Sequence, residues 1–124
     1  MMKKNFYKFC CAWMWILLLP LFCNGSDVQK KLLMEKGAVL LDVRSVQEYR
    51  AGHLRSAVNL PLDRLGKEIQ TLVKDPGTPL YLYCRSGRRS AEGLKVLQKM
   101  KYKKLYDLGG MKAAQKKLEF PVVK

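Results

Sequence analysis

Predicted strands alternate along this chain with segments whose apolar residues recur at helical spacing, and this alternation limits the available folds. The predicted strands, most of them short apolar runs, lie at 38–43, 56–60, 79–84 and 103–108. Helices are predicted at 27–36, 45–52, 62–73, 90–100 and 111–118. Such alternation favours an α/β fold with a parallel sheet covered on both faces. Ligands of such sheets bind beyond the carboxyl ends of the strands.

The first 25 residues differ in kind from the rest. Residues 1–8 carry three lysines and no acid, residues 9–22 carry no charge, and small residues follow. This arrangement is typical of a secretory signal peptide, and the apolar run is short for a membrane span. Cys23 and Gly25 occupy the −3 and −1 positions for cleavage before Ser26. We therefore expect a signal peptide at 1–25, a folded domain at 26–124 and export to the periplasm. An uncleaved inner-membrane anchor and lipidation at Cys23 are the alternatives.

The chain is strongly basic, with 24 Lys and Arg against 10 Asp and Glu and a formal net charge of +14. Such a charge suits nucleic acid, an anionic membrane surface or an anionic substrate. The lysines are scattered and no motif of interleaved aromatic and basic residues accompanies them, so no nucleic acid is expected. Weak association with anionic envelope surfaces stays open.

Cysteine usage singles out one residue. Cys10, Cys11 and Cys23 lie in the predicted leader, so cleavage would leave Cys84 as the single cysteine, unable to form an internal disulfide. No Cys, His and carboxylate cluster has metal-ligand spacing, and we expect neither a metal nor a cofactor.

Cys84 directly follows an apolar run and opens the sequence CRSGRR. A loop between a strand and a helix turns backbone N–H groups inward, and the helix start adds partial positive charge. Arg85, Arg88 and Arg89 add fixed charge, so Cys84 is placed to react as a thiolate with an anionic substrate.

Loop length separates two reactions that suit this arrangement, phosphate hydrolysis and sulfur transfer. Cysteine-based phosphatases resemble one another in C-x5-R, with arginine at the sixth position after cysteine. Here Ser90 holds that position and Arg89 holds the fifth, so the loop is one residue short for phosphate.

The chain resembles a single-domain rhodanese of the small, exported bacterial type. Landmarks D-V-R, E-Y, G-H-L and A-x-N-x-P occur in order within 40–62, and 81–91 contains the C-R-x-G-x-R loop. Residues 93–110 and 120–122 match the later helix, strand, double glycine and chain end, so the resemblance covers 26–124. One departure is Ala114, near a position where family members often have Trp.

The resemblance implies a rhodanese-like three-layer fold with a central, mostly parallel sheet flanked by helices. It implies a transferase, a thiosulfate sulfurtransferase in which Cys84 takes a sulfane sulfur from a small anionic donor as a persulfide. A thiophilic acceptor (cyanide, a thiol or a protein) then removes the sulfur. The alternatives are a persulfide carrier or redox partner with little small-molecule turnover, a cysteine-based phosphatase or arsenate reductase, and a binding module with an idle cysteine.

Site roles follow from the same resemblance. Arg85 and Arg89 are assigned to the substrate anion or the persulfide, and Arg88 to the entrance. Backbone N–H groups are expected from Ser86, Gly87 and Arg88, and Ser90 is expected to cap the next helix. Asp42 and Arg44 are given a supporting role, with an ion pair that holds loops together. Glu48 is attributed to a capping box with Ser45, and His53 to a packed or hydrogen-bonded turn.

Overall fold

The computed structural model describes residues 34–124. The predicted signal peptide and most of the helix expected at 27–36 lie outside these residues, and the described end of that helix, 34–36, is not helical. The helices are α1 (Val46–Ala51), α2 (Leu62–Leu72), α3 (Arg88–Lys99) and α4 (Met111–Leu118). The strands are β1 (Val39–Asp42), β2 (His53–Leu54), β3 (Val58–Asn59), β4 (Leu80–Cys84), β5 (Leu105–Gly110) and β6 (Val122–Val123).

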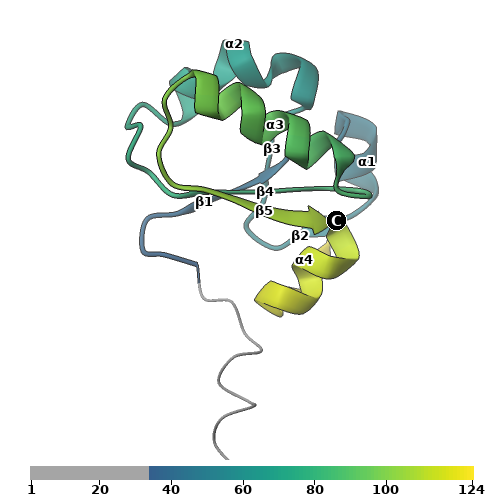
Figure 1. Cartoon of the computed structure of the whole chain (residues 1–124). Coiled ribbons are helices and arrows are strands. Elements are labelled where there is room, and N and C mark those ends of the chain that lie inside the picture. Colours follow the sequence, from purple (N-terminus) through teal and green to yellow (C-terminus); the bar gives the residue numbers. More distant parts are fainter. Residues whose placement is uncertain (1–33) are drawn as a thin grey trace, which may run out of the picture. The chain divides into compact units, whose positions relative to one another are not determined.

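Four strands form one parallel sheet in the order β3-β1-β4-β5 (Figure 1). Leu82 of β4 lies between Leu41 of β1 and Asp107 of β5 in the register. Because all the pairs are parallel, β1, β4 and β5 end at the same edge of the sheet. The parallel sheet predicted from the alternation of elements is therefore confirmed.

Helices cover both faces of this sheet: Figure 1 shows α2 and α3 on one side and α4 on the other. The residues of β4 alternate between the two faces, with Leu82 and Cys84 in the core under α2 and α3, and Tyr81 and Tyr83 in the core with α4. All of β4 is buried. This is why its sequence reads as a continuous apolar run. None of the helices in the described part of the chain has the length and apolar character that a membrane span requires.

A second, two-stranded sheet was not predicted. His53 and Leu54 of β2 pair antiparallel with Val123 and Val122 of β6. Two residues are too few to show the alternation by which a strand is recognised in sequence. The pairing ties the end of the chain to the turn after α1.

Of two helix starts predicted from capping residues, one is confirmed and one is wrong. Ser45 and Glu48 form the predicted capping box at α1, each side chain accepting a hydrogen bond from the other's backbone N–H. By contrast, α3 begins at Arg88, two residues before the expected start, with Gly87 as its N-cap. Gly87 adopts φ +100°, a left-handed conformation that a β-carbon disfavours. Ser90 is therefore inside the helix and does not cap it.

Candidate active site around Cys84

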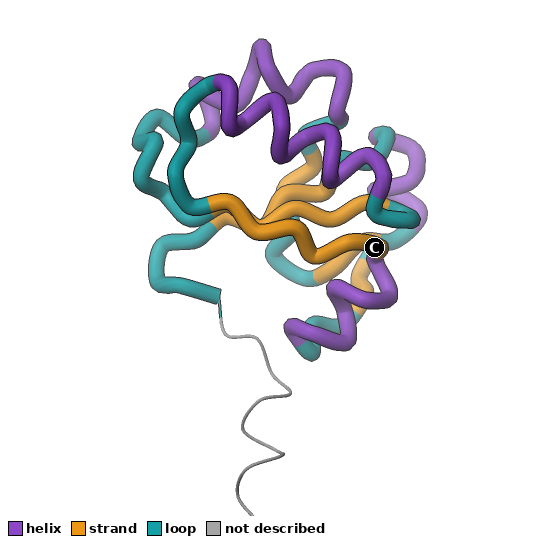
Figure 2. Tube along the Cα trace, in the orientation of Figure 1, coloured by secondary structure: helices purple, strands orange, loops and turns teal. Residues whose placement is uncertain are grey.

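Cys84 is the last residue of β4, and residues 85–87 connect it to α3. Cys84 pairs in register with Gly110, the last residue of β5. Figure 2 shows the short connection between β4 and α3 at the edge of the sheet where β5 also ends. The site thus lies at the carboxyl edge, where parallel sheets bind ligands.

The Cys84 sulfur is enclosed by its own loop. The residue is 0 % exposed, and the Gly87 N–H donates a hydrogen bond to Sγ at 2.9 Å. Burial alone would raise the pKa of the thiol. Hydrogen bonds from the backbone N–H groups of Ser90, Gly87 and Ser86 outweigh burial and lower the pKa of Cys84 below its usual value. The loop therefore favours a thiolate.

The backbone of the loop, more than its arginines, lowers the pKa of Cys84. The sequence predicted N–H groups from Ser86, Gly87 and Arg88, whereas the structure uses Ser90 in place of Arg88. The difference follows from the early start of α3, because the first turn of a helix has N–H groups without helical partners and the Ser90 N–H lies in that turn. Attraction to the Cys84 thiolate is a smaller contribution, one of several that raise the pKa of Arg89.

Arg89, assigned from the sequence to the substrate anion, instead binds Glu48 of α1. Its Nη1 and Nη2 donate to Glu48 Oε2 and Oε1 at 2.7 and 2.9 Å. The Arg89 guanidinium lowers the pKa of the Glu48 carboxyl to about 2. Glu48 is thus a site residue that the sequence analysis missed. The capping box already accounted for Glu48, and a separation of 41 positions along the chain gave no local signal.

Arg85 and Arg88 are exposed at the loop and, within residues 34–124, form no ion pair of the kind that holds Arg89. Two cationic side chains therefore remain available to an approaching anion. Arg88 is solvent-facing, as expected, and its role at the entrance stays a prediction.

Two glycines let the β5–α4 turn pack against this loop. A β-carbon on Gly110 would lie 2.7 Å from the Arg85 carbonyl oxygen, and one on Gly87 would lie 3.4 Å from Gly109 Cα. The sequence resemblance included the double glycine, but it did not show that its backbone supports the cysteine loop.

A buried ion pair closes the end of β1. Arg44 Nε and Nη2 donate to the Asp42 carboxylate at 2.6–3.0 Å, and Nη2 also donates to the Gly52 carbonyl at 2.7 Å. The Tyr83 hydroxyl donates to Asp42 Oδ2 at 2.8 Å and accepts from the Leu54 N–H at 3.0 Å. The ion pair expected between Asp42 and Arg44 is present, and it links β1, β4 and the turn after α1.

His53 is packed and hydrogen-bonded, as expected. Its ring stacks on Tyr49 with centroids 3.7 Å apart, and Nδ1 lies 2.9 Å from the Tyr49 carbonyl oxygen. A neighbour that the sequence analysis missed is Asp107 of β5. The Ser90 hydroxyl lies 2.7 Å from Asp107 Oδ1 and 3.8 Å from Cys84 Sγ.

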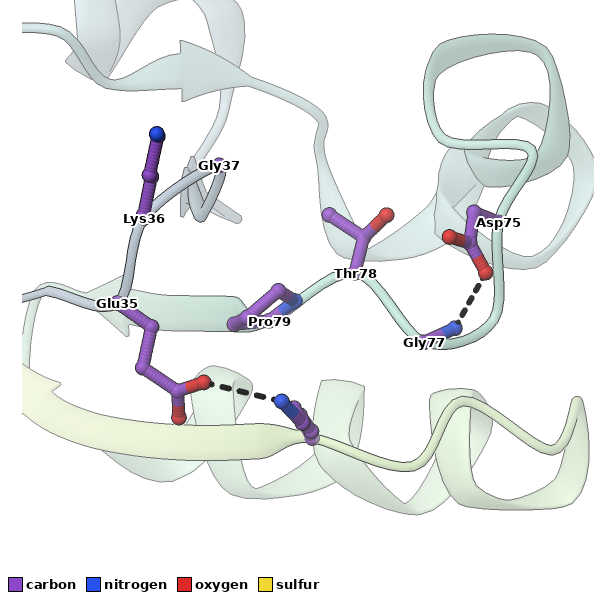
Figure 3. A pocket seen from close by; sticks show the side chains of 8 residues that line it. Glu35, Lys36, Gly37, Asp75, Gly77, Thr78 and Pro79 are labelled. Carbon is purple, nitrogen blue, oxygen red and sulfur yellow. Dashed lines mark hydrogen bonds and ion pairs between the residues drawn. The ribbon is translucent and has the colours of Figure 1, made fainter.

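A hollow of about 580 Å³ lies at the opposite edge of the sheet, where β1, β4 and β5 begin (Figure 3). Its acidic groups already have partners within the protein. Asp75 Oδ1 accepts from the Gly77 N–H at 2.8 Å, and Glu35 binds Lys104 at 3.2 Å and the Tyr106 hydroxyl. The reactive groups gather at the other edge, around Cys84.

The sequence of the whole domain agrees with this geometry. The family model described as "Rhodanese-like domain" matches residues 26–117. The chain belongs to the rhodanese-like family. In this rhodanese-like protein, Ala114 lies near the position at which the resemblance leads one to expect Trp. Ala114 is 0 % exposed in the core with α4. The departure noted from the sequence therefore falls in the core.

Named relatives place the chain among rhodanese-like sulfurtransferases. It is 33% identical over 72 residues to thiosulfate sulfurtransferase PspE of Escherichia coli K12, covering 58% of this chain and 69% of that one. It is 29% identical over 80 residues to the putative sulfur carrier protein YrkF of Bacillus subtilis, covering 64% of this chain and 42% of the relative. A solved structure titled "rhodanese with anions from E. coli" has a TM-score of 0.64 and 31% identity, covering 70% of this chain and 98% of that one. The three-layer rhodanese fold predicted from the resemblance is confirmed.

Proposed function

We propose that this protein transfers a sulfane sulfur from thiosulfate, or a similar small anion, through Cys84 to a thiophilic acceptor. The observation that carries the proposal is the environment of the Cys84 sulfur. The sulfur is buried and accepts a hydrogen bond from the Gly87 N–H at 2.9 Å, and the loop lowers the pKa of the thiol. A thiolate is the form of cysteine that attacks sulfur.

The first step forms one bond and breaks one. The Cys84 thiolate attacks the outer sulfur of thiosulfate, the S–S bond of thiosulfate breaks, and sulfite leaves with the electron pair. The product is a Cys84 persulfide anion. Because the thiolate and the persulfide are both anions at the same place, the backbone N–H groups that favour the first also favour the second.

The second step regenerates the Cys84 thiolate. A nucleophile such as cyanide or a thiolate attacks the outer sulfur of the persulfide, and the Cys84 thiolate is the leaving group. A leaving thiolate of low pKa departs faster. The same loop therefore assists both halves of the cycle.

In this proposal, the exposed arginines bind the sulfur donor. Arg85 and Arg88 face a dianionic donor without a competing carboxylate of the kind that holds Arg89. Arg89 then acts as a support, holding α3 to α1 through Glu48 beside the loop. Sulfur donor and acceptor partners agree with the names of the relatives PspE and YrkF.

The test is the intact mass of the full chain after thiosulfate, and again after cyanide. We expect wild type to gain the mass of one sulfur atom and to lose it to cyanide. Cys84→Ser should gain none, and the matched control Cys23→Ser should behave as wild type. No gain on wild type while Cys84 still alkylates quickly would overturn thiosulfate as the donor.

A second candidate is a persulfide carrier that delivers sulfur to a protein. The likeness to YrkF, a putative sulfur carrier protein, favours it. A carrier would load sulfur in the mass experiment yet turn over slowly with cyanide and small thiols. Steady turnover with these small acceptors would favour the enzyme.

A further inference from the structure

The Ser90 hydroxyl connects Cys84 to a carboxylate on another strand. Ser90 Oγ lies 2.7 Å from Asp107 Oδ1, 2.9 Å from the Gly87 carbonyl oxygen and 3.8 Å from Cys84 Sγ. Ser90 is 0 % exposed, so water does not compete for its hydroxyl. Its single proton can go to only one of these three acceptors.

Asp107 is the acceptor that the geometry favours. Its contact with Ser90 is the shortest of the three, and a hydrogen bond to a charged carboxylate is stronger than one to a neutral carbonyl. The Gly109 N–H also donates to Asp107 Oδ1 at 2.8 Å, so the carboxylate is held in place by its own strand. With its proton on the Asp107 side, Ser90 Oγ presents a lone pair to the cysteine sulfur.

We propose that Asp107 is a positioning residue for Cys84: its carboxylate holds the Ser90 hydroxyl proton away from the sulfur, so that only backbone N–H groups stabilise the thiolate. A lone pair facing Sγ accepts a hydrogen bond from a thiol but repels a thiolate. Asp107 therefore opposes the backbone donors and keeps the sulfur more basic than the loop alone would make it.

This opposition serves reactivity. Among thiolates, nucleophilicity falls as the pKa falls, with a Brønsted coefficient of about 0.4–0.5. A loop that stabilised the thiolate with every available donor would make it abundant but weakly reactive. Asp107 sets the balance between the abundance of the thiolate and its reactivity. The inference rests on the proposed function only in that Cys84 reacts as a thiolate.

Other charged groups surround the loop and must stay constant in a test. They are Arg85, Arg88 and Arg89 of the loop and α3, Glu48 of α1, the Asp42–Arg44 pair after β1, and Lys112 in the first turn of α4. Asp107→Asn leaves all of them in place. The asparagine conserves the shape and keeps an oxygen for the Gly109 N–H. Because a neutral amide oxygen is a weaker acceptor than a carboxylate, the Ser90 hydroxyl can then turn its proton toward the thiolate.

The experiment measures alkylation of Cys84 by the neutral reagent iodoacetamide as a function of pH. The full chain is used, and the reaction is followed on the tryptic peptide 75–85, in which Cys84 is the sole cysteine. We expect Asp107→Asn to lower the midpoint of the profile by about one pH unit, because the released Ser90 hydroxyl then donates a hydrogen bond to the thiolate. The rate at the high-pH plateau should fall by about threefold, because the thiolate is less basic.

A double-mutant cycle tests whether Ser90 is the intermediary. In a Ser90→Ala background, Asp107→Asn should shift the midpoint by less than half of its effect in wild type. An equal shift in both backgrounds, or no shift in either, overturns the proposal. Circular dichroism checks folding, and Ser90→Gly replaces Ser90→Ala if that variant does not fold.

Glu92→Gln is the matched control. Glu92 is exposed on α3, so this variant removes the same charge without altering the acceptor of the Ser90 hydroxyl. Its midpoint should equal that of wild type, and a shift as large as that of Asp107→Asn would overturn the proposal. Alkylation needs no sulfur donor, so failure here is distinguishable from failure of sulfur loading on the wild-type chain.

Discussion

Arg89 and Glu48 form a two-point ion pair between α3 and α1, with N–O distances of 2.7 and 2.9 Å. The pair joins the helix that follows the cysteine loop to the helix that follows β1. The pair occupies both terminal nitrogens of one of the three arginines in the sequence CRSGRR. In the proposed function, Arg89 is therefore a support, and the donor is left to Arg85 and Arg88.

The first prediction concerns the acid sensitivity of this pair. The pKa of Glu48 is about 2 in the folded protein, below its unfolded value of about 4.5. The stabilisation is thus fully present above pH 4.5 and is lost as the pH falls toward 2. We expect Glu48→Gln to lose about 1–2 kcal/mol of unfolding free energy at pH 7, a figure reduced because both side chains are 29 % exposed.

Urea unfolding of wild type and Glu48→Gln between pH 7 and pH 2.5 measures this difference. The gap between the two proteins should shrink as the pH falls below 4.5. Glu92→Gln, an exposed acid on α3, serves as the control and should stay within about 0.5 kcal/mol of wild type. A gap that is constant across this range would contradict the assignment.

The second prediction concerns the buried Asp42–Arg44 pair. Removing one partner leaves the other charge buried without compensation, which costs about 3–5 kcal/mol. We expect Asp42→Ala to lose this amount in urea unfolding at pH 7, because the Arg44 guanidinium would lose its carboxylate and keep a neutral acceptor, the Gly52 carbonyl. Tyr83→Phe removes one hydroxyl from the same network and should cost about 1–3 kcal/mol. Equal costs for the two variants would mean that the ion pair itself contributes little.

Local sequence signals were enough for the strand, loop and helix around Cys84. β4 is recognised as a continuous apolar run, α3 is long enough to show helical periodicity, and the loop between them is read directly from one short stretch. The capping box at Ser45 and Glu48 is equally local. These elements place the cysteine at the carboxyl edge of the sheet without any knowledge of tertiary contacts.

The remaining site contacts depend on side chains far apart in sequence. Glu48 lies 41 residues from Arg89, and Asp107 lies 17 residues from Ser90. Neither separation leaves a pattern in the sequence, and the capping box was already an adequate local explanation for Glu48. The start of α3 was misplaced because Ser90 is a good capping residue by type, whereas Gly87 can take the left-handed conformation that the tight loop requires.

The third prediction concerns the glycine that supports the loop. A β-carbon at Gly110 would meet the Arg85 carbonyl oxygen at 2.7 Å and Ser86 Cα at 3.5 Å, both of them backbone atoms. Gly110→Ala should therefore displace the loop and slow sulfur loading of Cys84 by at least about tenfold, since small misplacements of reacting groups are costly. The measurement is the rate of sulfur gain by intact mass.

Gly37→Ala is the control for backbone strain alone. Gly37 has φ +78° and no atom within 4 Å of the added carbon, and it lies at the opposite edge of the sheet. It should lower the unfolding free energy by about 1 kcal/mol and leave the loading rate unchanged. If Gly110→Ala loads sulfur as fast as Gly37→Ala, the close packing of the loop is not required for the reaction.

The fourth prediction separates the entrance arginines from the thiolate. Arg85 and Arg88 are exposed, so their attraction for a dianionic donor is screened by salt. Replacing both by Gln should reduce kcat/KM for thiosulfate by about tenfold and weaken its dependence on ionic strength. Alkylation of Cys84 by neutral iodoacetamide should change little, because the loop backbone causes most of the pKa shift. Lys95→Gln with Lys99→Gln, which removes the same charge from the exposed face of α3, should leave kcat/KM nearly unchanged. An equal loss in both double variants would show that the protein's overall charge, not the loop, draws the donor in.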